Sequence, residues 1–520
     1  MTRTEMHRRL RAHSGAWDMI VTGGGATGVG VAIDAASRGY DVLLLEQSDF
    51  GKGTSSRSTK LVHGGVRYLE QGNVSLVMEA LKERGLLARN APHLVRNLGF
   101  VVPNYDWWEA PFYGIGLKLY NLLAGKYGFG ASRILSREET LERLPTIKPD
   151  GLRGGVIYFD GQFDDSRLLI NLVATAFEQG ATLLNYAPVT GLTKDSEGFV
   201  DGVHFRDAET GEEFEAHAMV VINATGPFAD ALRRQADPTV QPMIAPSQGI
   251  HLVFDRSFLA GDNAIMVPHT SDGRVMFAIP WHGHTVVGTT DTPIAEPSLE
   301  PAPLEQEIEF ILQTSALYLA KTPTRDDIRS VFAGIRPLVK SGEGGNTAAL
   351  SRDHTIRIEN SGLVTVCGGK WTTYRHMAED CVNQAATLAR LPDRPCVTEH
   401  LNIHGFHPSS EKFGRLWMYG SDAPLVEPIA ESAEPLDGDL PYTSAEVLWA
   451  VREEMARTLE DVLARRTRAL FLNSQAALRM APRVARLMAA ELKQDEGWES
   501  EQLENFRATA RNYLVGGGPS

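Results

Sequence analysis

Three glycines at a characteristic spacing follow the first strand-like segment of the chain. Gly23, Gly25 and Gly28 form the pattern GxGxxG directly after residues 18–22. In this pattern the first glycine permits a tight turn, the second lets a pyrophosphate approach the backbone, and the third lets a helix pack closely on a strand. The free N–H groups at the start of that helix bind phosphate. The spacing therefore predicts a dinucleotide site.

An acidic residue ends the second strand-like segment. Residues 40–45 are typical of a strand, and Glu46 follows them, close to the distance of about 20 residues that is usual after the glycine pattern. A carboxylate at this position accepts hydrogen bonds from ribose hydroxyls and disfavours a 2′-phosphate. The glycines and Glu46 do not by themselves distinguish FAD from NAD.

Three later segments favour FAD. Residues 53–58 (GTSSRS) lie where an extended flavin cofactor would continue, and residues 221–226 (VINATG) form a second strand with small residues at its end. Residues 368–373 (GGKWTT) open a late helix, whose positive end, together with its lysine, can stabilise charge on a reduced flavin. With the glycines and Glu46, we expect FAD to be held by Ala26, Thr27, Thr54, Ser55, Ser58, Thr59, Lys60, Leu61, Val189, Ala224, Thr225, Gly226, Gly369, Lys370, Thr372 and Thr373.

The elements around these motifs predict an α/β fold. Residues 18–45 form a βαβ unit, and helical spacing recurs at residues 74–91, 165–180, 301–319 and 443–493. We predict a Rossmann-like FAD-binding domain (17–90, 150–240 and 345–390) interleaved with a β-rich substrate or cap domain (91–149 and 241–344), and a C-terminal α-helical domain (391–520). Residues 1–16 are expected to form a frayed arm, and residues 421–441 to form a linker.

Composition narrows the possible partners. The net charge of −14 argues against nucleic acid, although residues 451–493 are locally basic. Cys367, Cys381 and Cys396 form no CxxC pair, so we expect no metal site, disulfide framework or redox dithiol. No apolar run is long enough to span a membrane, so any membrane contact is expected to be peripheral.

Six further segments resemble a known family. They are residues 57–70 (RSTKLVHGGVRYLE), 158–162 (YFDGQ), 288–291 (GTTD), 334–338 (GIRPL), 369–375 (GKWTTYR) and 457–468 (RTLEDVLARRTR). Together they resemble the FAD-dependent glycerol-3-phosphate dehydrogenases. Because the sequence shows no EF-hand loop, it resembles the bacterial type of that family. The resemblance implies oxidation of sn-glycerol 3-phosphate to dihydroxyacetone phosphate, with hydride transfer to flavin N5. It also implies that electrons pass to a membrane quinone.

A dianionic substrate requires fixed cations, and arginine forks suit phosphate best. Arg336 is the first candidate, Arg67 with Tyr68 the second, and Arg352 a weaker one. Oxidation of an alcohol also requires a base, for which His63 and His251 compete. Lys370 is expected to stabilise the alkoxide or the flavin anion, and Thr289 or Thr290 to bind the substrate.

Several alternatives remain open from the sequence. Residues 107–130 are aromatic and form either a cap over the active site or a lipid-contacting surface; their glycines are expected to interrupt a helix. An amino-acid oxidase-like flavoenzyme and a non-catalytic or RNA-modifying flavoprotein are the rival functions. We expect the protein to attach to the inner face of the cytoplasmic membrane through the aromatic stretch or through the basic residues 451–493. A homodimer is a possible form of the protein.

Overall fold

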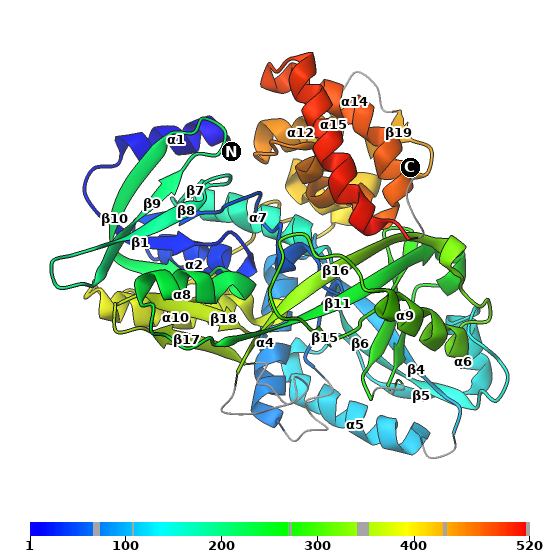
Figure 1. Ribbon diagram of the computed structural model, residues 1–520. Helices are drawn as coiled ribbons and strands as arrows, with labels where there is room; N and C mark the ends of the chain where they lie inside the picture. Colours follow the sequence, from blue (N-terminus) through cyan, green and yellow to red (C-terminus); the bar gives the residue numbers. More distant parts are fainter. Residues whose placement is uncertain are drawn as a thin grey trace.

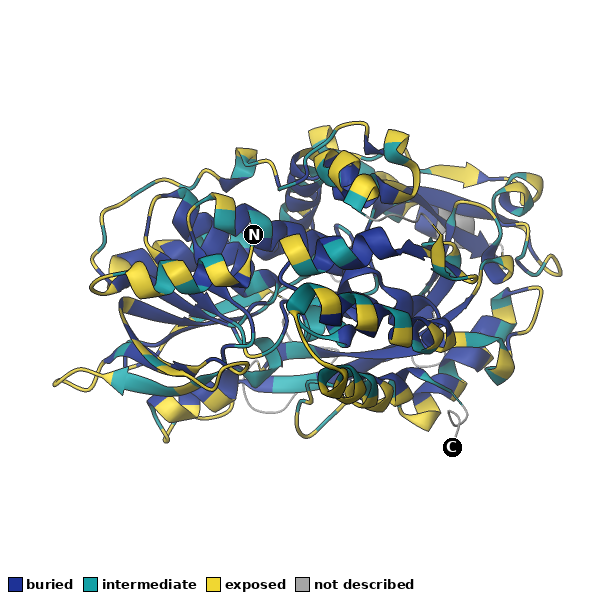
Figure 2. Cartoon of the chain, turned by 90° about the horizontal axis from the view of Figure 1, so that it is seen from above, coloured by how far each residue is buried: buried dark blue, intermediate teal, exposed yellow. Residues whose placement is uncertain are grey.

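The computed structural model describes residues 1–65, 73–106, 109–268, 270, 273–340, 353–429 and 434–515, except for the side chains of residues 109–112. The described chain forms two sheets that lie next to one another, and the C-terminal helices pack against the larger of them (Figure 1). In Figure 2 the strands are mostly buried, while the outer helices alternate between buried and exposed residues.

The first sheet is mainly parallel and has β1 near its centre. Its strand order is β17-β18-β10-β1-β2-β7, and β8 and β9 extend β10 as an antiparallel ribbon. The sheet's helices include α2, which packs against α10 and α7. Because parallel strands are covered on both faces, β1 is apolar throughout its centre and fully buried there. The bounds are β1 Trp17–Thr22, β2 Val42–Leu45, β7 Thr182–Leu184, β8 Val189–Lys194, β9 Val200–Arg206, β10 Glu213–Asn223, β17 His354–Ile358, β18 Val364–Gly368, α2 Ala26–Ser37, α7 Asp165–Glu178, α8 Ala229–Ala236 and α10 Tyr374–Leu388.

The second sheet is largely antiparallel and follows the order β15-β11-β14-β13-β12-β4-β6-β3, with β16 on β11 and β5 on β6. The register of β11 with β16 places Ser247 opposite Arg336 and His251 opposite Phe332. The bounds are β3 Leu61–Val62, β4 Val95–Asn104, β5 Arg133–Leu135, β6 Gly154–Phe163, β11 Ile244–Asp255, β12 Ala264–Val267, β13 Met276–Trp281, β14 His284–Gly288, β15 Thr292–Pro293, β16 Ile328–Val339, α4 Val74–Asn90, α5 Glu109–Ala124, α6 Arg137–Arg143 and α9 Glu305–Tyr318.

The C-terminal region is helical, as predicted, and its buried core is continuous with that of the second sheet. One turn, Asp461–Arg466, is a π-helix. The elements are α11 Ala423–Val426, β19 Pro435–Asp437, β20 Leu440–Thr443, α12 Ser444–Glu453, α13 Ala469–Leu472, α14 Ser474–Leu492 and α15 Glu496–Ala510. The predicted fold class, an FAD-binding α/β unit interleaved with a β-rich unit and followed by helices, is confirmed.

Three local predictions were wrong. Residues 3–12 form a docked helix, α1 (Arg3–Ala12), and not a frayed arm, because Met6 is fully buried and Arg3 pairs with Asp207. Gly114 and Gly116 lie inside α5, so they do not interrupt it. The expected linker contains α11, β19 and β20 among its described residues.

Many arginines of the basic stretch 451–493 pair with carboxylates of the protein. Arg465, Arg466 and Arg468 are almost fully buried and pair with carboxylates, two of them with Asp49. Other arginines of the stretch pair with carboxylates at the surface, for example Arg452 with Glu491. Ion pairing within the protein therefore neutralises much of the charge that the sequence suggested was free.

Candidate active site

The glycine turn after β1 adopts the geometry that its spacing predicts. Gly23 has a φ of +109°, where a side chain would be strained, and a Cβ there would lie 2.6 Å from the Ala224 carbonyl oxygen. A Cβ at Gly28 would lie 1.9 Å from the Gly23 carbonyl oxygen, so only glycine allows α2 to pack this close. Gly25 caps α2 with no side-chain hydrogen bond. The turn thus leaves room beside the start of the helix.

Glu46 lies at the end of β2 and faces this turn. Its carboxylate accepts hydrogen bonds from the backbone N–H groups of Gly24, at 2.6 Å, and Ser48, at 2.9 Å. Burial raises the pKa of Glu46, and these two hydrogen bonds oppose the rise. The carboxylate is therefore held at the rim of the turn, as a ribose ligand must be.

A cavity of about 290 Å³ opens at the turn, and we call it the glycine-loop cavity. It lies at one edge of the first sheet, where the carboxyl ends of the parallel strands β1, β2 and β10 meet. The structure brings these predicted cofactor residues to it: Gly23, Gly25, Ala26, Thr27, Glu46, Thr54, Ser55, Val189, Ala224, Thr225, Gly226, Gly369 and Lys370. The cavity is also lined by residues that were not predicted from the sequence: Gln47, Phe228, Gln235, Trp371 and Tyr374. Only Trp371 and Tyr374 could have been found from a motif, because they lie in the segment 369–375.

Two further cavities, of about 250 and 230 Å³, adjoin one another beside the glycine-loop cavity, and we call them together the arginine cavity. The first of them shares Gly368, Gly369, Lys370 and Trp371 with the glycine-loop cavity. The residues common to both parts of the arginine cavity are Thr59, Leu61, His63, Phe277, Thr289 and Arg336. A cofactor spanning the two regions would therefore meet a substrate at Arg336.

The guanidinium of Arg336 is held by polar partners in this cavity. One nitrogen lies 3.3 Å from the Asp291 carboxylate, and another donates to the Thr289 hydroxyl at 3.1 Å and the Thr290 carbonyl at 3.0 Å. The Thr290 hydroxyl instead donates to Glu307 of α9, and this bond holds the segment after β14 in place. Sequence reasoning missed Asp291, within a quoted motif, and Arg274, which also lines the cavity but belongs to no motif.

Both candidate bases reach the arginine cavity. The His251 ring stacks on Phe332, and its Nε2 lies 3.0 Å from the Thr59 hydroxyl. Burial, followed by the nearby charges of Lys60 and Arg336, lowers the pKa of His251 well below its usual value. His251 is therefore neutral near pH 7.

His63 lies on a loop that other parts of the protein anchor. Its backbone N–H donates to the Thr372 hydroxyl at 3.1 Å, and the N–H of Gly64 donates to the Tyr120 hydroxyl at 2.8 Å. Tyr120 in turn donates to Asp160. Asp160 belongs to the motif 158–162, for which the sequence predicted no role. The histidine is thus positioned by segments remote in sequence.

Not every predicted residue reaches the cavity expected for it. Ser58, Thr59, Leu61 and Thr372 line the arginine cavity, and Thr373 bonds to the Lys370 carbonyl. Lys60 lines none of these cavities, because its ammonium is buried 2.7 Å from Asp165. Burial lowers the pKa of Lys60 to about 7, against the opposing effect of Asp165. Arg67, Tyr68 and Arg352 lie outside the described residues.

The geometry of the glycine turn and of Glu46 fits a dinucleotide cofactor. A Cβ would collide with backbone at Gly23 and Gly28, the N-cap residue of α2 is a glycine, and Glu46 stands at the ribose position. We expect further residues, notably Lys370 at the start of the late helix, to face the flavin end.

Comparisons with known proteins agree with this site. Residues 18–376 match the family described as FAD dependent oxidoreductase, and residues 396–501 match the C-terminal domain of alpha-glycerophosphate oxidase. Mitochondrial glycerol-3-phosphate dehydrogenase of Arabidopsis thaliana is 42% identical, over 94% of this chain and 85% of its own length. The human mitochondrial enzyme is 40% identical, over 96% of this chain and 73% of its own length.

Solved structures give the same result. The glycerol-3-phosphate dehydrogenase of Bacillus halodurans, complexed with FAD, superposes with a TM-score of 0.80 at 30% identity, covering 99% of this chain and 98% of that one. Glycine oxidase from Geobacillus kaustophilus, at 20% identity and a TM-score of 0.55, shares the fold alone over 73% of this chain and 96% of its own. The chain belongs to the FAD-dependent glycerol-3-phosphate dehydrogenase family.

Proposed function

We propose that this protein oxidises sn-glycerol 3-phosphate to dihydroxyacetone phosphate. The observation that carries the proposal is the position of Arg336 in a cavity that shares the wall 368–371 with the glycine-loop cavity. A planar cation in a fixed hydrogen-bonding frame suits a phosphate, which a guanidinium can bind through two parallel bonds. The names of the relatives support the same substrate.

The chain's residues divide between cofactor and substrate. The glycine turn and Glu46 would hold the pyrophosphate and a ribose of FAD, and the segments 53–55, 224–226 and 368–370 would enclose the rest. FAD, when bound, supplies the acceptor for the hydride that leaves the substrate carbon. Arg336 binds the substrate phosphate, and Thr289 orients that arginine through its hydroxyl.

The hydroxyl proton of the substrate must pass to a base on the protein. His251 and His63 both line the arginine cavity, and one of them accepts this proton. His251 is neutral at physiological pH because its pKa lies well below the usual value, so it has a lone pair to accept a proton. Lys370 lines both cavities and supplies positive charge where negative charge develops.

An anaerobic titration of the purified yellow protein tests this function. Glycerol 3-phosphate should bleach the flavin absorbance, whereas glycerol at the same concentration should not, because glycerol has no phosphate for Arg336. Equal bleaching by the two compounds would contradict the phosphate site. Bleaching by amino acids alone would favour the oxidase-like alternative.

We further propose that electrons pass to a membrane quinone at the inner face of the cytoplasmic membrane. Within the part of the chain that the structure describes, no helix is long and apolar enough to cross a bilayer. Helix α5 supports a peripheral contact, because Ile115, Leu119 and Leu122 recur at helical spacing and are 73%, 44% and 77% exposed. An exposed apolar helix face can insert among lipid headgroups.

Vesicle sedimentation tests the membrane proposal. The double variant Ile115→Ser/Leu122→Ser should bind anionic phospholipid vesicles at least about tenfold more weakly than the wild type, because burying a large apolar side chain is worth about 1.5–3 kcal/mol. Leu317→Ser is a matched control, since Leu317 is 68% exposed on α9. Unchanged binding of the double variant, or rapid peroxide formation without reduction of a quinone analogue, would contradict the proposal.

A further inference from the structure

The loop that joins β2 to β3 has two functional faces. Gln47, Gly51, Gly53, Thr54 and Ser55 line the glycine-loop cavity. Other residues of the same loop are turned to the C-terminal helical region, where they form ion pairs. Apart from one short 3-10 turn at Thr54–Ser56, this loop has no regular secondary structure. Its position therefore depends on what holds its second face.

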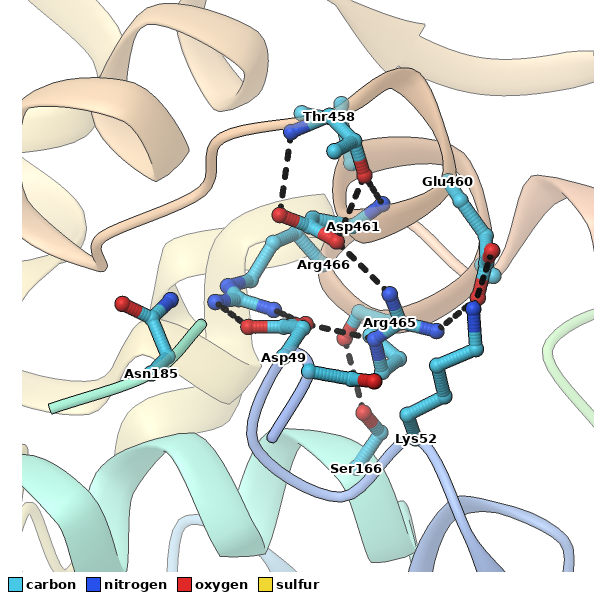
Figure 3. Close-up of polar contacts among 12 residues, drawn as sticks. Asp49, Lys52, Ser166, Asn185, Thr458, Glu460, Asp461, Arg465 and Arg466 are labelled. Carbon is cyan, nitrogen blue, oxygen red and sulfur yellow. Dashed lines mark hydrogen bonds and ion pairs between the residues drawn. The ribbon is translucent and has the colours of Figure 1, made fainter. Parts of the chain in front are cut away.

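The strongest anchor of that face is Asp49. Its carboxylate accepts two hydrogen bonds from the Arg466 guanidinium, at 2.8 and 3.0 Å, and a further one from Arg465 (Figure 3). All three side chains are buried. Burial alone would raise the pKa of Asp49, but the two guanidinium groups outweigh it and lower the pKa to about 2. The carboxylate is therefore charged and fully paired at physiological pH.

The two arginines are adjacent in the π-helical turn Asp461–Arg466. In this turn both reach Asp49, and the Asp461 carboxylate holds Arg465 at 2.7 Å (Figure 3). π-helical turns are uncommon and occur frequently at functional sites.

Two further contacts extend the anchor along the loop. Lys52 pairs with Glu460 at 2.8 Å, and Glu460 also accepts from Arg465 at 2.6 Å (Figure 3). Arg468, which follows the π-turn, donates to the Ser56 carbonyl at 2.8 Å. Residues 49, 52 and 56 thus bracket Gly51, Gly53, Thr54 and Ser55 of the cavity wall. Ser55 also accepts from the backbone N–H of Ala26, at the start of α2.

We propose that the C-terminal helical region is part of the cofactor site, in which Arg465 and Arg466 act as positioning residues for the FAD-binding loop. By holding Asp49, they keep the loop against the start of α2, where its residues complete the glycine-loop cavity. The region contributes to FAD affinity without contacting FAD. This role concerns cofactor binding alone, so it does not depend on which substrate the enzyme oxidises.

The test is titration of FAD into apoprotein, followed by flavin fluorescence. Arg466→Lys and Asp49→Asn should each raise the FAD dissociation constant about ten- to a hundredfold, the range for losing a charged hydrogen bond. Arg3→Lys is the matched control: Arg3 is also buried and pairs with a carboxylate, that of Asp207, but it lies on α1, and its partners belong neither to the loop nor to the π-helical turn. It should change the constant less than about threefold while lowering the melting temperature comparably.

Circular dichroism must first show that each variant is folded at the temperature of the titration. If Arg466→Lys does not fold, Glu460→Gln replaces it, because the Lys52–Glu460 pair is partly accessible. A wild-type FAD constant in the folded variants would overturn the proposal, as would an equal change in Arg3→Lys. Because no substrate is present, neither result depends on the proposed oxidation of glycerol 3-phosphate.

Discussion

The Nε2 of His251 lies 3.0 Å from the hydroxyl of Thr59, although the two residues are 192 positions apart in the sequence. Thr59 belongs to a segment that also lines the arginine cavity, while His251 lies on β11, opposite Phe332 of β16. The pairing therefore joins the loop between β2 and β3 to β11 of the second sheet. It also fixes the ring of one candidate base within the cavity.

We expect the two histidines to be distinguishable by their pH dependence. Replacing the proton acceptor by glutamine should lower the rate of flavin reduction about 10²–10⁴-fold. If His251 is the acceptor, the acid limb of the wild-type profile should lie well below pH 6.5, because its pKa is lowered by burial and then by Lys60 and Arg336. Rapid-reduction kinetics from pH 4.5 to 9 measure this. An acid limb that only His63→Gln removes would assign the role to His63.

Arg336→Ala should lower kcat/KM for glycerol 3-phosphate about ten- to a hundredfold, since a hydrogen bond to a charged group contributes about 1.5–3 kcal/mol. Steady-state assays with a quinone analogue measure the effect. Arg256→Ala is the control and should be unchanged, because Arg256 begins a 3-10 turn and lines neither part of the arginine cavity. A larger loss in Arg274→Ala than in Arg336→Ala would transfer the phosphate site to Arg274, which lines the same cavity.

Gly25→Val should abolish FAD binding while the apoprotein remains folded. A Cβ at Gly25 would lie 3.0 Å from the Ser55 hydroxyl, and the larger side chain would enter the space that the pyrophosphate requires. Gly116→Ala is the control, because its Cβ would meet nothing within 4 Å. Visible absorbance after purification, with circular dichroism for folding, measures the outcome. A yellow Gly25→Val protein would show that the turn does not hold the pyrophosphate.

The stability of the protein should depend on His404 in a defined pH range. Burial alone would lower the pKa of His404, but its contacts with Asp422 and Glu178 raise it from 6.5 to about 10. Since the folded-state pKa is the higher one, the stabilisation is fully present below pH 6.5 and disappears as the pH rises to about 10.

Melting temperatures of the wild type and His404→Gln measure this effect. The difference between the two proteins should be greatest at pH 6 and should shrink steadily towards pH 10. A difference that is independent of pH would show that His404 is uncharged in the folded protein. Asp439→Asn is a suitable control, because Asp439 pairs with Arg479 at an exposed site and should have little effect.

Much of the cofactor site was accessible from the sequence because its determinants are local. The turn at Gly23, the start of α2 at Ala26 and the carboxylate of Glu46 lie within one βαβ unit, where strand and helix periods fix their relative positions. The family motifs then placed Arg336 and His63 near the cofactor, and both line the arginine cavity. Local spacing could not place Lys60, whose long side chain turns away to Asp165.

The sequence by itself determined the fold class, the FAD cofactor and the family. Close backbone packing leaves few alternatives to glycine at Gly23 and Gly28, and the six quoted motifs carried the resemblance to the family. Only the tertiary structure decided which charged side chains are buried in ion pairs and which are exposed. Arg465 and Arg466 suggest a basic surface in the sequence, whereas in the folded chain they are buried against Asp49, more than 400 residues away. A buried guanidinium requires a carboxylate partner. Which carboxylate pairs with it depends on how the C-terminal helices pack against the loop between β2 and β3.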